Sequence, residues 1–138
     1  MKILVTGSSG HLGEALMRTL NDRQQDAIGL DITPSPFTHV IGSVADRAIV
    51  ARAMDGVDAV IHTATLHKPH VITHTRQDFV DTNISGTLNL LEEAVVQRVK
   101  SFVFTSTTSV FGDAMAPPAG QPAVWVTEDL KQIGRAHV

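Results

Sequence analysis

The stretch KILVTGSSGHLG, residues 2–13, decides the fold. Its first part, Lys2–Thr6, is apolar and predicts a strand, and three glycines spaced G-x-x-G-x-x-G follow directly. Apolar residues at helical spacing come next and predict a helix. Glycine lets a backbone approach a ligand closely, and a helix N-terminus offers free N–H groups to a phosphate. We interpret Gly7–Gly13 as a turn that binds a pyrophosphate; a tight connection without a ligand is the alternative.

Short apolar runs and helical patterns alternate along the rest of the chain. Further strands are predicted at 27–32, 38–41, 59–62 and 101–105, and further helices at 46–54 and 75–97, with a loop at 114–122. Strands that alternate with helices form a parallel sheet buried between two helical layers. The predicted fold class is therefore α/β, a Rossmann-type doubly wound sheet, and 138 residues accommodate one domain.

Composition excludes several classes of protein. The net charge is −3 with acids and bases interspersed, so no basic surface indicates a nucleic-acid partner. Cysteine is absent, which suits a reducing compartment, and no signal peptide follows Met1. No apolar stretch approaches the roughly 20 residues of a membrane span. We expect a cytoplasmic protein with a small-molecule ligand and no membrane partner.

Asp31, at the end of the second predicted strand, indicates which dinucleotide binds. An acidic residue about 20 positions beyond such a glycine loop accepts a hydrogen bond from a ribose hydroxyl and repels a 2′-phosphate. No Arg or Lys occurs between Gln24 and Ala45 to receive that phosphate. We therefore expect NAD rather than NADP; a solvated aspartate at a strand end is the alternative.

Four histidines, His62, His67, His70 and His74, fall within 13 residues and raise the question of a metal site. Only the last pair has a helical spacing, and no carboxylate or thiolate joins the group before Asp78. We expect no metal here. We predict instead that His62 lies in the core near the cofactor and that His67 lies in a loop facing substrate.

Four separated motifs stand in a fixed order between Met1 and about Leu130. They read Thr6–Gly13 (T-G-x-x-G-x-x-G), Gly42–Asp46 (G-D-h-x-D, with Ser43 at the usual Asp), Val60–Thr65, and Asn83–Leu91 (N-h-x-G-T-x-N-L-L). Together they resemble the extended short-chain dehydrogenase/reductases, the NAD-dependent epimerase/dehydratase family. The resemblance implies a sheet with strand order 3-2-1-4-5, incomplete in this chain, and NAD as cofactor. It assigns cofactor contacts to Gly7, Ser9, Gly10, His11, Leu12, Gly13, Asp31, Ser43, Val44, Thr63, Ala64, Thr65, Asn83 and Thr105.

Thr105–Gly112 is similar to the family's S-S-[ST]-x-x-V-Y-G segment, with Phe111 at the place of its Tyr. Counting back five from Gly112, Thr107 takes the position of the catalytic Ser/Thr, whose hydroxyl hydrogen-bonds the substrate oxygen that is oxidised. The alternative is that these hydroxyls only cap a strand end and a turn. The implied activity is hydride transfer between a sugar or sugar nucleotide and the nicotinamide, by an epimerase, dehydratase or oxidoreductase. A non-catalytic NAD(P)-binding sensor is the alternative function.

The family's Tyr-x-x-x-Lys motif should follow Thr107 by about 25–30 residues, but the chain contains no tyrosine. Its last six residues, Ile133–Val138, are encoded by ATC GGA AGA GCA CAC GTC, which matches a common sequencing-library adapter. We therefore expect residues 1–132 to be the N-terminal part of a cofactor domain, inactive by itself, and 133–138 to be a non-native tail. A genuine C-terminus is the alternative. The resemblance also implies a homodimer of the full-length protein, formed through the helix at 75–97.

Overall fold

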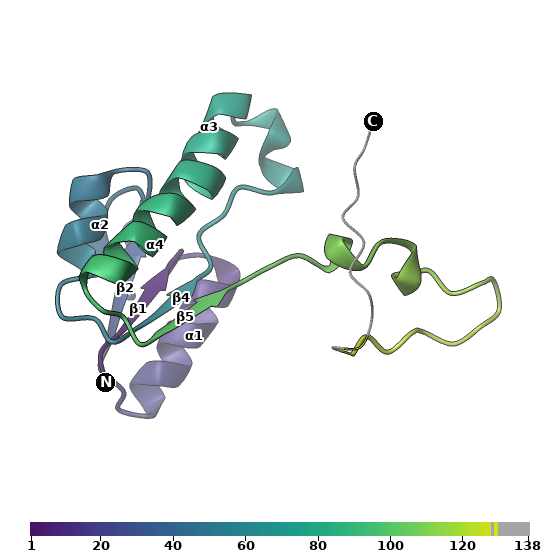
Figure 1. Ribbon diagram of the computed structural model, residues 1–138, viewed down its shortest axis with the longest axis horizontal. Coiled ribbons are helices and arrows are strands. Elements are labelled where there is room, and N and C mark those ends of the chain that lie inside the picture. Colours follow the sequence, from purple (N-terminus) through teal and green to yellow (C-terminus); the bar gives the residue numbers. More distant parts are fainter. Residues whose placement is uncertain (128, 130–138) are drawn as a thin grey trace. The chain divides into compact units, whose positions relative to one another are not determined.

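A computed structural model describes residues 1–127 and Asp129. The chain divides into two compact units, Met1–Thr105 and Ser106–Val138. The first unit contains a five-stranded sheet with helices on both faces (Figure 1). Its strands are β1 (Ile3–Thr6), β2 (Ala27–Asp31), β3 (Val40–Ile41), β4 (Ala59–His62) and β5 (Ser101–Phe104). Its α-helices are α1 (His11–Asp22), α2 (Arg47–Ala53), α3 (Arg76–Val80) and α4 (Gly86–Val96).

All strand pairs are parallel and follow the order β3-β2-β1-β4-β5, which confirms the predicted α/β class and strand order. The register places Thr6 of β1 opposite His62 of β4, and His62 opposite Phe104 of β5. The loops that follow β1, β4 and β5 therefore leave the sheet at one edge. Open α/β sheets bind their ligands at this carboxyl edge.

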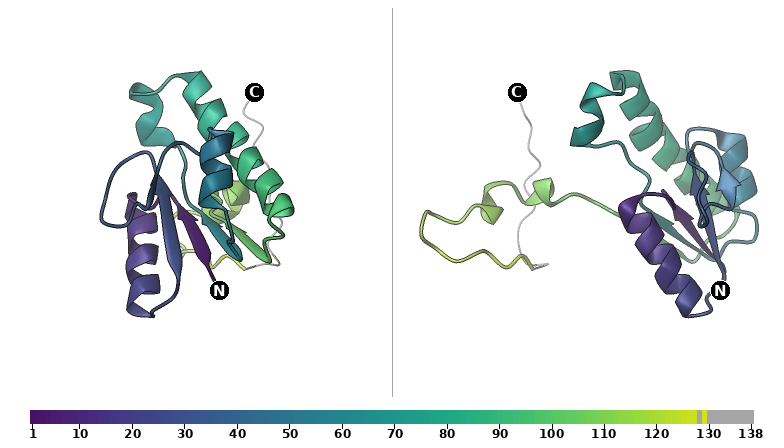
Figure 2. Two further views of the ribbon diagram at one scale, coloured as in Figure 1. Left: turned by 90° about the vertical axis from the view of Figure 1, so that its left-hand side faces the viewer. Right: turned by 180° about the vertical axis from the view of Figure 1, so that it is seen from behind.

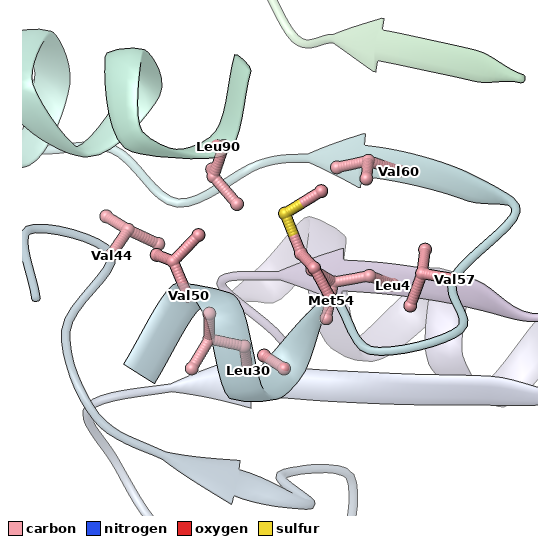
Figure 3. Close-up of a cluster of buried hydrophobic side chains, with 9 residues drawn as sticks. Leu4, Leu30, Val44, Val50, Met54, Val57, Val60 and Leu90 are labelled. Carbon is pink, nitrogen blue, oxygen red and sulfur yellow. The ribbon is translucent and has the colours of Figure 1, made fainter. Parts of the chain in front are cut away.

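Alternating strand residues form a core on each face of the sheet. Leu4, Leu30 and Val60 belong to a cluster with α2 and α4, in which Met54 and Leu90 are fully buried (Figure 3). On the other face, Ile3, Val5 and Ala59 pack against Met17 of α1. The left view of Figure 2 shows α1 on one side of the strands and α2 and α4 on the other. This two-sided burial explains why the central strands β1 and β4 are mostly apolar.

The predicted helix at 75–97 is interrupted. Thr75 caps its start in a capping box with Asp78, but a π-helical segment, η2 (Asp81–Ser85), separates α3 from α4. There the Gly86 N–H donates to the Asp81 carbonyl, five residues back instead of four. The apolar stripe that predicted the helix faces outward, at 41–79% exposure: Val80, Ile84, Leu88, Leu91 and Val95. Leu90, which is outside that stripe, is the residue of α4 that is buried in the core.

At two strand ends that differ from the prediction, a side chain adds a hydrogen bond to those between the backbones. His39 was expected in a strand at 38–41, but it brackets Gly29 instead: its N–H donates to the Gly29 carbonyl, and its Nδ1 accepts the Gly29 N–H at 3.0 Å. Thr105 lies just beyond the end of β5, an outermost strand of the sheet, and donates both its N–H and its hydroxyl to the His62 carbonyl. The predicted helix at 46–54 is correct, and Asp46 caps it.

The second unit contains a 3-10 segment, η3 (Thr108–Met115), broken at Gly112, whose φ is 52°. It extends into the start of the loop that was predicted at 114–122, and Val110 donates its N–H to the Thr107 carbonyl at 3.3 Å. The proposed tail at 133–138 lies outside the described residues. In the part of the chain that the structure describes, no helix has the length and apolarity needed to cross a membrane.

Candidate functional site

The glycine loop between β1 and α1 is shaped by backbone packing. Gly7 has a φ of +71°, and a Cβ there would lie 2.8 Å from the backbone nitrogen of Ala64, in the loop after β4. A Cβ on Gly13 would lie 1.9 Å from the Gly7 carbonyl oxygen. No other side chain fits either position without a backbone shift. These two glycines therefore bring the start of α1 close to the sheet edge.

Gly10, the middle glycine of the loop, is less crowded than Gly7 and Gly13. It is the N-cap of α1, with φ −76° and ψ 165°, and its added Cβ would meet only the Gly7 oxygen, at 3.2 Å. No side chain within the described residues caps the first turn of α1. Gly10, His11 and Leu12 are exposed. The helix therefore presents the positive end of its dipole and free N–H groups to solvent, an arrangement that binds anions such as phosphate.

Asp31 is fixed beside this loop. Its Oδ2 accepts the Ser9 N–H at 3.0 Å and its Oδ1 accepts the Thr33 N–H at 2.9 Å. A carboxylate offers about four lone-pair sites, so both oxygens can still accept a hydroxyl. The structure thus places an acceptor for a diol next to a site for a phosphate. A ribose joined to a pyrophosphate requires these two features side by side.

Residues 43–45, the segment before α2, lie at the same edge of the sheet. The side chains of Ser43 and Val44 make contacts within the protein. The Ser43 hydroxyl accepts the Ala45 N–H, and Val44 is buried at 5% exposure. Asn89 of α4 donates to the carbonyls of both Val44 and Ala45, at 3.1 Å each. A Cβ on Gly86 would come within 2.5 Å of Val44. The predicted cofactor contact of Val44 could therefore be made by its backbone, because its side chain belongs to the core.

The loop after β4 lines a small, partly open hollow. Its walls are His62, Thr63, Ala64, Thr65, Asn83, Thr87, Phe104 and Thr105. This hollow is far smaller than the roughly 300–1,000 Å³ of a pocket for a whole drug-sized ligand, so it could take only a small part of a dinucleotide. The Asn83 amide holds the loop in place: it donates to the Leu66 carbonyl and accepts the Leu66 N–H, both at 2.8 Å. Asn83 therefore shapes the wall of the hollow as well as lining it.

His62 is buried at 1% exposure, as predicted for a core histidine. Its Nδ1 lies 2.6 Å from the Thr6 hydroxyl and its Nε2 lies 3.0 Å from the Thr87 hydroxyl. Burial lowers the pKa of His62 to about 4, so its ring is neutral at pH 7. Sequence reasoning did not select Thr6 or Thr87 as site residues. The only signal for Thr87 was its place in the N-h-x-G-T-x-N-L-L motif.

Two roles that the sequence suggested stay predictions, the catalytic role of Thr107 and the substrate-facing position of His67. Thr107 belongs to the second unit, so its catalytic role stays a prediction. The 3-10 helix η1 (Lys68–Ile72) follows the loop after β4. In this region the His70 ring lies edge-on to the rings of His67 and His74, with ring centroids 4.6 Å and 5.5 Å apart. Within residues 1–127 and Asp129, no group of three or more His, Cys, Asp or Glu side chains could hold a metal ion.

Comparison with known proteins gives a consistent result. Residues 3–129 match the model of the NAD dependent epimerase/dehydratase family. A 3-beta-hydroxysteroid dehydrogenase of Mycolicibacterium neoaurum is 34% identical over 119 residues, which cover 79% of this chain and 32% of the relative. A UDP-glucose 4-epimerase of Erwinia amylovora is 31% identical, over 99% of this chain and 50% of its own length.

Among solved structures, a short-chain dehydrogenase/reductase superfamily protein from Agrobacterium tumefaciens with bound NAD superimposes with a TM-score of 0.79 and 30% identity. The match covers 99% of this chain and 40% of that protein. The chain thus spans between a third and a half of the length of these relatives. The family match across residues 3–129, together with the glycine loop, Asp31 and the strand order, confirms the resemblance seen in the sequence: the chain belongs to the NAD-dependent epimerase/dehydratase family.

Proposed function

We propose that this chain is the NAD-binding part of an enzyme that transfers hydride between a sugar or sugar nucleotide and the nicotinamide. One observation carries the proposal: the Asp31 carboxylate lies 3.0 Å from the Ser9 N–H, inside a glycine loop that leads into the uncapped α1. The side-by-side acceptor and anion site match the ribose and pyrophosphate of a dinucleotide. The glycine loop fits this ligand because Gly10 leaves its outer face open.

Each part of the site has a defined task when NAD binds. The N–H groups at the start of α1 would hold the pyrophosphate, and Asp31 would accept hydrogen bonds from the adenosine ribose. The backbone of Ser43 and Val44, and the loop Thr63–Thr65, would form the walls beside the rest of the cofactor. NAD supplies a hydride acceptor at its nicotinamide ring, and the chain supplies binding and orientation. The Thr107 hydroxyl would hold the reacting oxygen of the substrate.

Isothermal titration calorimetry of the 138-residue chain with NAD and NADP tests the cofactor assignment. NAD should bind more tightly, because a 2′-phosphate would be repelled by Asp31. Asp31→Asn should weaken NAD binding about tenfold, as expected for loss of a charge-assisted hydrogen bond, and Asp31→Ala should also narrow the preference for NAD. Asp26→Asn is the matched control: it makes the same charge change at an exposed residue before β2, at the opposite edge of the sheet. Tighter binding of NADP by the unsubstituted chain would overturn the assignment.

The substrate class is the second part of the proposal. The Erwinia relative is a UDP-glucose 4-epimerase, which supports a sugar nucleotide. The Mycolicibacterium relative is a 3-beta-hydroxysteroid dehydrogenase, which makes a sterol the second candidate. The open reading frame that contains this sequence in its source genome should be expressed and assayed with NAD and each substrate class. Turnover of a hydroxysteroid, but of no sugar nucleotide, would contradict the first choice.

A non-catalytic sensor would bind NAD through the same residues. The same open reading frame separates the two functions. An enzyme requires the Tyr-x-x-x-Lys motif, because the tyrosine takes the proton of the substrate hydroxyl while the hydride leaves. A frame without that motif, whose product binds NAD but turns over no alcohol or sugar, would favour the sensor.

A further inference from the structure

A continuous chain of hydrogen bonds runs through the buried ring of His62. At one end the Thr6 hydroxyl lies 2.6 Å from His62 Nδ1 and is also 3.2 Å from the backbone nitrogens of Thr63 and Ala64. At the other end His62 Nε2 lies 3.0 Å from the Thr87 hydroxyl, which donates to the Asn83 carbonyl at 2.8 Å. The chain therefore connects β1, the loop after β4 and the π-helical segment η2.

Counting donors fixes the position of every proton in this chain. A hydroxyl donates one hydrogen bond and accepts two. The Thr6 hydroxyl oxygen accepts the Ala64 N–H and a share of the Thr63 N–H, which also points to the Thr6 carbonyl at 3.3 Å, so its own proton is left for His62 Nδ1. Nδ1 is then unprotonated, and a neutral ring carries its proton on Nε2.

The opposite end gives the same answer independently. The single proton of the Thr87 hydroxyl is used on the Asn83 carbonyl, so Thr87 can only accept from His62. His62 Nε2 must therefore be the donor. Two different sets of neighbours require one tautomer, the form with N–H at Nε2 and a lone pair at Nδ1.

We propose that His62, held as the neutral Nε2–H tautomer by Thr6 and Thr87, is a positioning residue that sets the backbone of the loop Thr63–Leu66. The loop is attached to both ends of the chain of hydrogen bonds. The backbone N–H groups of Thr63 and Ala64 donate to the Thr6 hydroxyl. The Leu66 N–H donates to the side chain of Asn83, and the backbone carbonyl of Asn83 accepts the Thr87 hydroxyl. The His62 carbonyl also accepts the N–H and hydroxyl of Thr105, so the same residue ties in the end of β5.

The location agrees with a functional role. Insertions of a π turn into a helix occur frequently at functional sites, and η2 provides the carbonyl on which the chain of hydrogen bonds ends. Three of the residues that His62 positions, Thr63, Ala64 and Thr65, line the hollow at the carboxyl edge of the sheet. This inference rests on the proposed function only where it claims an effect on NAD; the tautomer and the loop geometry can be tested without the ligand.

The first test is NMR of the 138-residue chain with ¹⁵N-labelled histidine at pH 7. The signals of His62 are identified by their loss in His62→Gln. We expect a pyridine-type nitrogen at Nδ1 and a protonated, pyrrole-type nitrogen at Nε2 in the spectrum of the unsubstituted chain. A proton on Nδ1, a mixture of tautomers, or a doubly protonated ring would overturn the proposal.

The second test compares substitutions at Thr87. Thr87→Ser keeps the acceptor for Nε2–H, whereas Thr87→Val removes it at similar size. Backbone amide signals of Thr63–Leu66 should shift in Thr87→Val and return in Thr87→Ser, and the Kd for NAD should rise about tenfold only in the valine variant. Thr19→Val is the matched control, because the Thr19 hydroxyl also donates to a carbonyl four residues back, on the exposed side of α1.

The outcomes separate the two proposals. If the unsubstituted chain shows the expected tautomer and amide shifts but binds no NAD, the proposed function fails and the positioning role stands. If Thr87→Val is folded and leaves the amides of Thr63–Leu66 unchanged, the positioning role fails, whatever the affinity for NAD. Equal effects of Thr87→Ser and Thr87→Val would also refute it.

Discussion

Acidification should destabilise the folded chain through His62. The pKa of an unfolded histidine is about 6.5, and burial lowers it to about 4 in the folded chain. Between these two pKa values the His62 ring is protonated in the unfolded chain but not in the folded chain. The free energy of unfolding therefore falls as the pH falls. Above pH 6.5 both states are neutral and His62 has no effect, and below pH 4 its full penalty is present.

The magnitude follows from the difference between the two pKa values, about 2.5 pH units. Each unit corresponds to about 1.4 kcal/mol, so the total penalty is about 3 kcal/mol, of which about 2.5 kcal/mol has developed at pH 4.5. That is a large fraction of the roughly 5–15 kcal/mol of stability of a typical domain. Burial is the cause of the lowered pKa, and the hydrogen bonds agree with a neutral ring, because a proton on Nδ1 would face a Thr6 hydroxyl that already accepts backbone N–H groups.

Urea denaturation between pH 7 and pH 4.5, followed by far-UV circular dichroism, measures this effect. Trp125 is 91% exposed and belongs to the second unit, so its fluorescence does not report on the sheet. Two acidic side chains with lowered pKa, Asp58 and Asp78, also lose stabilising interactions on protonation, but only as the pH falls below their ordinary value of 3.8. His62→Gln should remove most of the slope, and His11→Gln, at an exposed residue, should leave it unchanged. Parallel stability curves for the unsubstituted chain and His62→Gln would refute the reasoning.

Three further predictions concern the glycine loop, the hydroxyl run and the exposed helix. Gly13→Ala should destabilise the fold by about 3 kcal/mol in urea denaturation, because its Cβ would lie 1.9 Å from a carbonyl oxygen, whereas Gly10→Ala should fold normally and weaken NAD binding. In an enzyme that contains this chain, Thr107→Ala should lower turnover about 100-fold and Thr107→Ser should retain much of it; a larger loss in Thr108→Ala would contradict the assignment. In light scattering the 138-residue chain should be mainly monomeric, since the resemblance assigns half of the dimer interface to a Tyr-x-x-x-Lys helix that this sequence does not contain. A tight dimer would contradict this.

The α/β class and the glycine loop could be predicted because both depend on local sequence, whereas the strand order came from the resemblance to the family. Apolar runs of four or five residues between helical patterns fit only a sheet covered on both faces, and the glycines mark where backbone segments touch. The π segment could not be predicted, because one extra residue in a turn leaves the apolar pattern of a helix nearly unchanged. The same pattern located helical structure at 75–97 without its interruption, and the apolar stripe faces outward while Leu90 makes the core contact.

The partners of His62 could not be predicted for a different reason. Thr6 and Thr87 lie 56 and 25 residues away from His62 in the sequence, and only the parallel register of β1 and β4 brings the first of them into contact. The packing of Val44 also could not be predicted from the sequence. A motif placed it beside the cofactor, but the packing of α4 shows that its side chain fills the core.

Four residues of the motif N-h-x-G-T-x-N make contacts that give a physical reason for the residue type at each position. Asn83 fastens the loop after β4, Gly86 allows close packing against the segment before α2, and Thr87 fixes the tautomer of His62. Asn89 then holds the carbonyls of that same segment before α2. All four residues act on the two walls of the proposed cofactor site and none is free to select a substrate. Because the contacts of these four residues are made within the protein, the motif carries no information about the molecule that is oxidised.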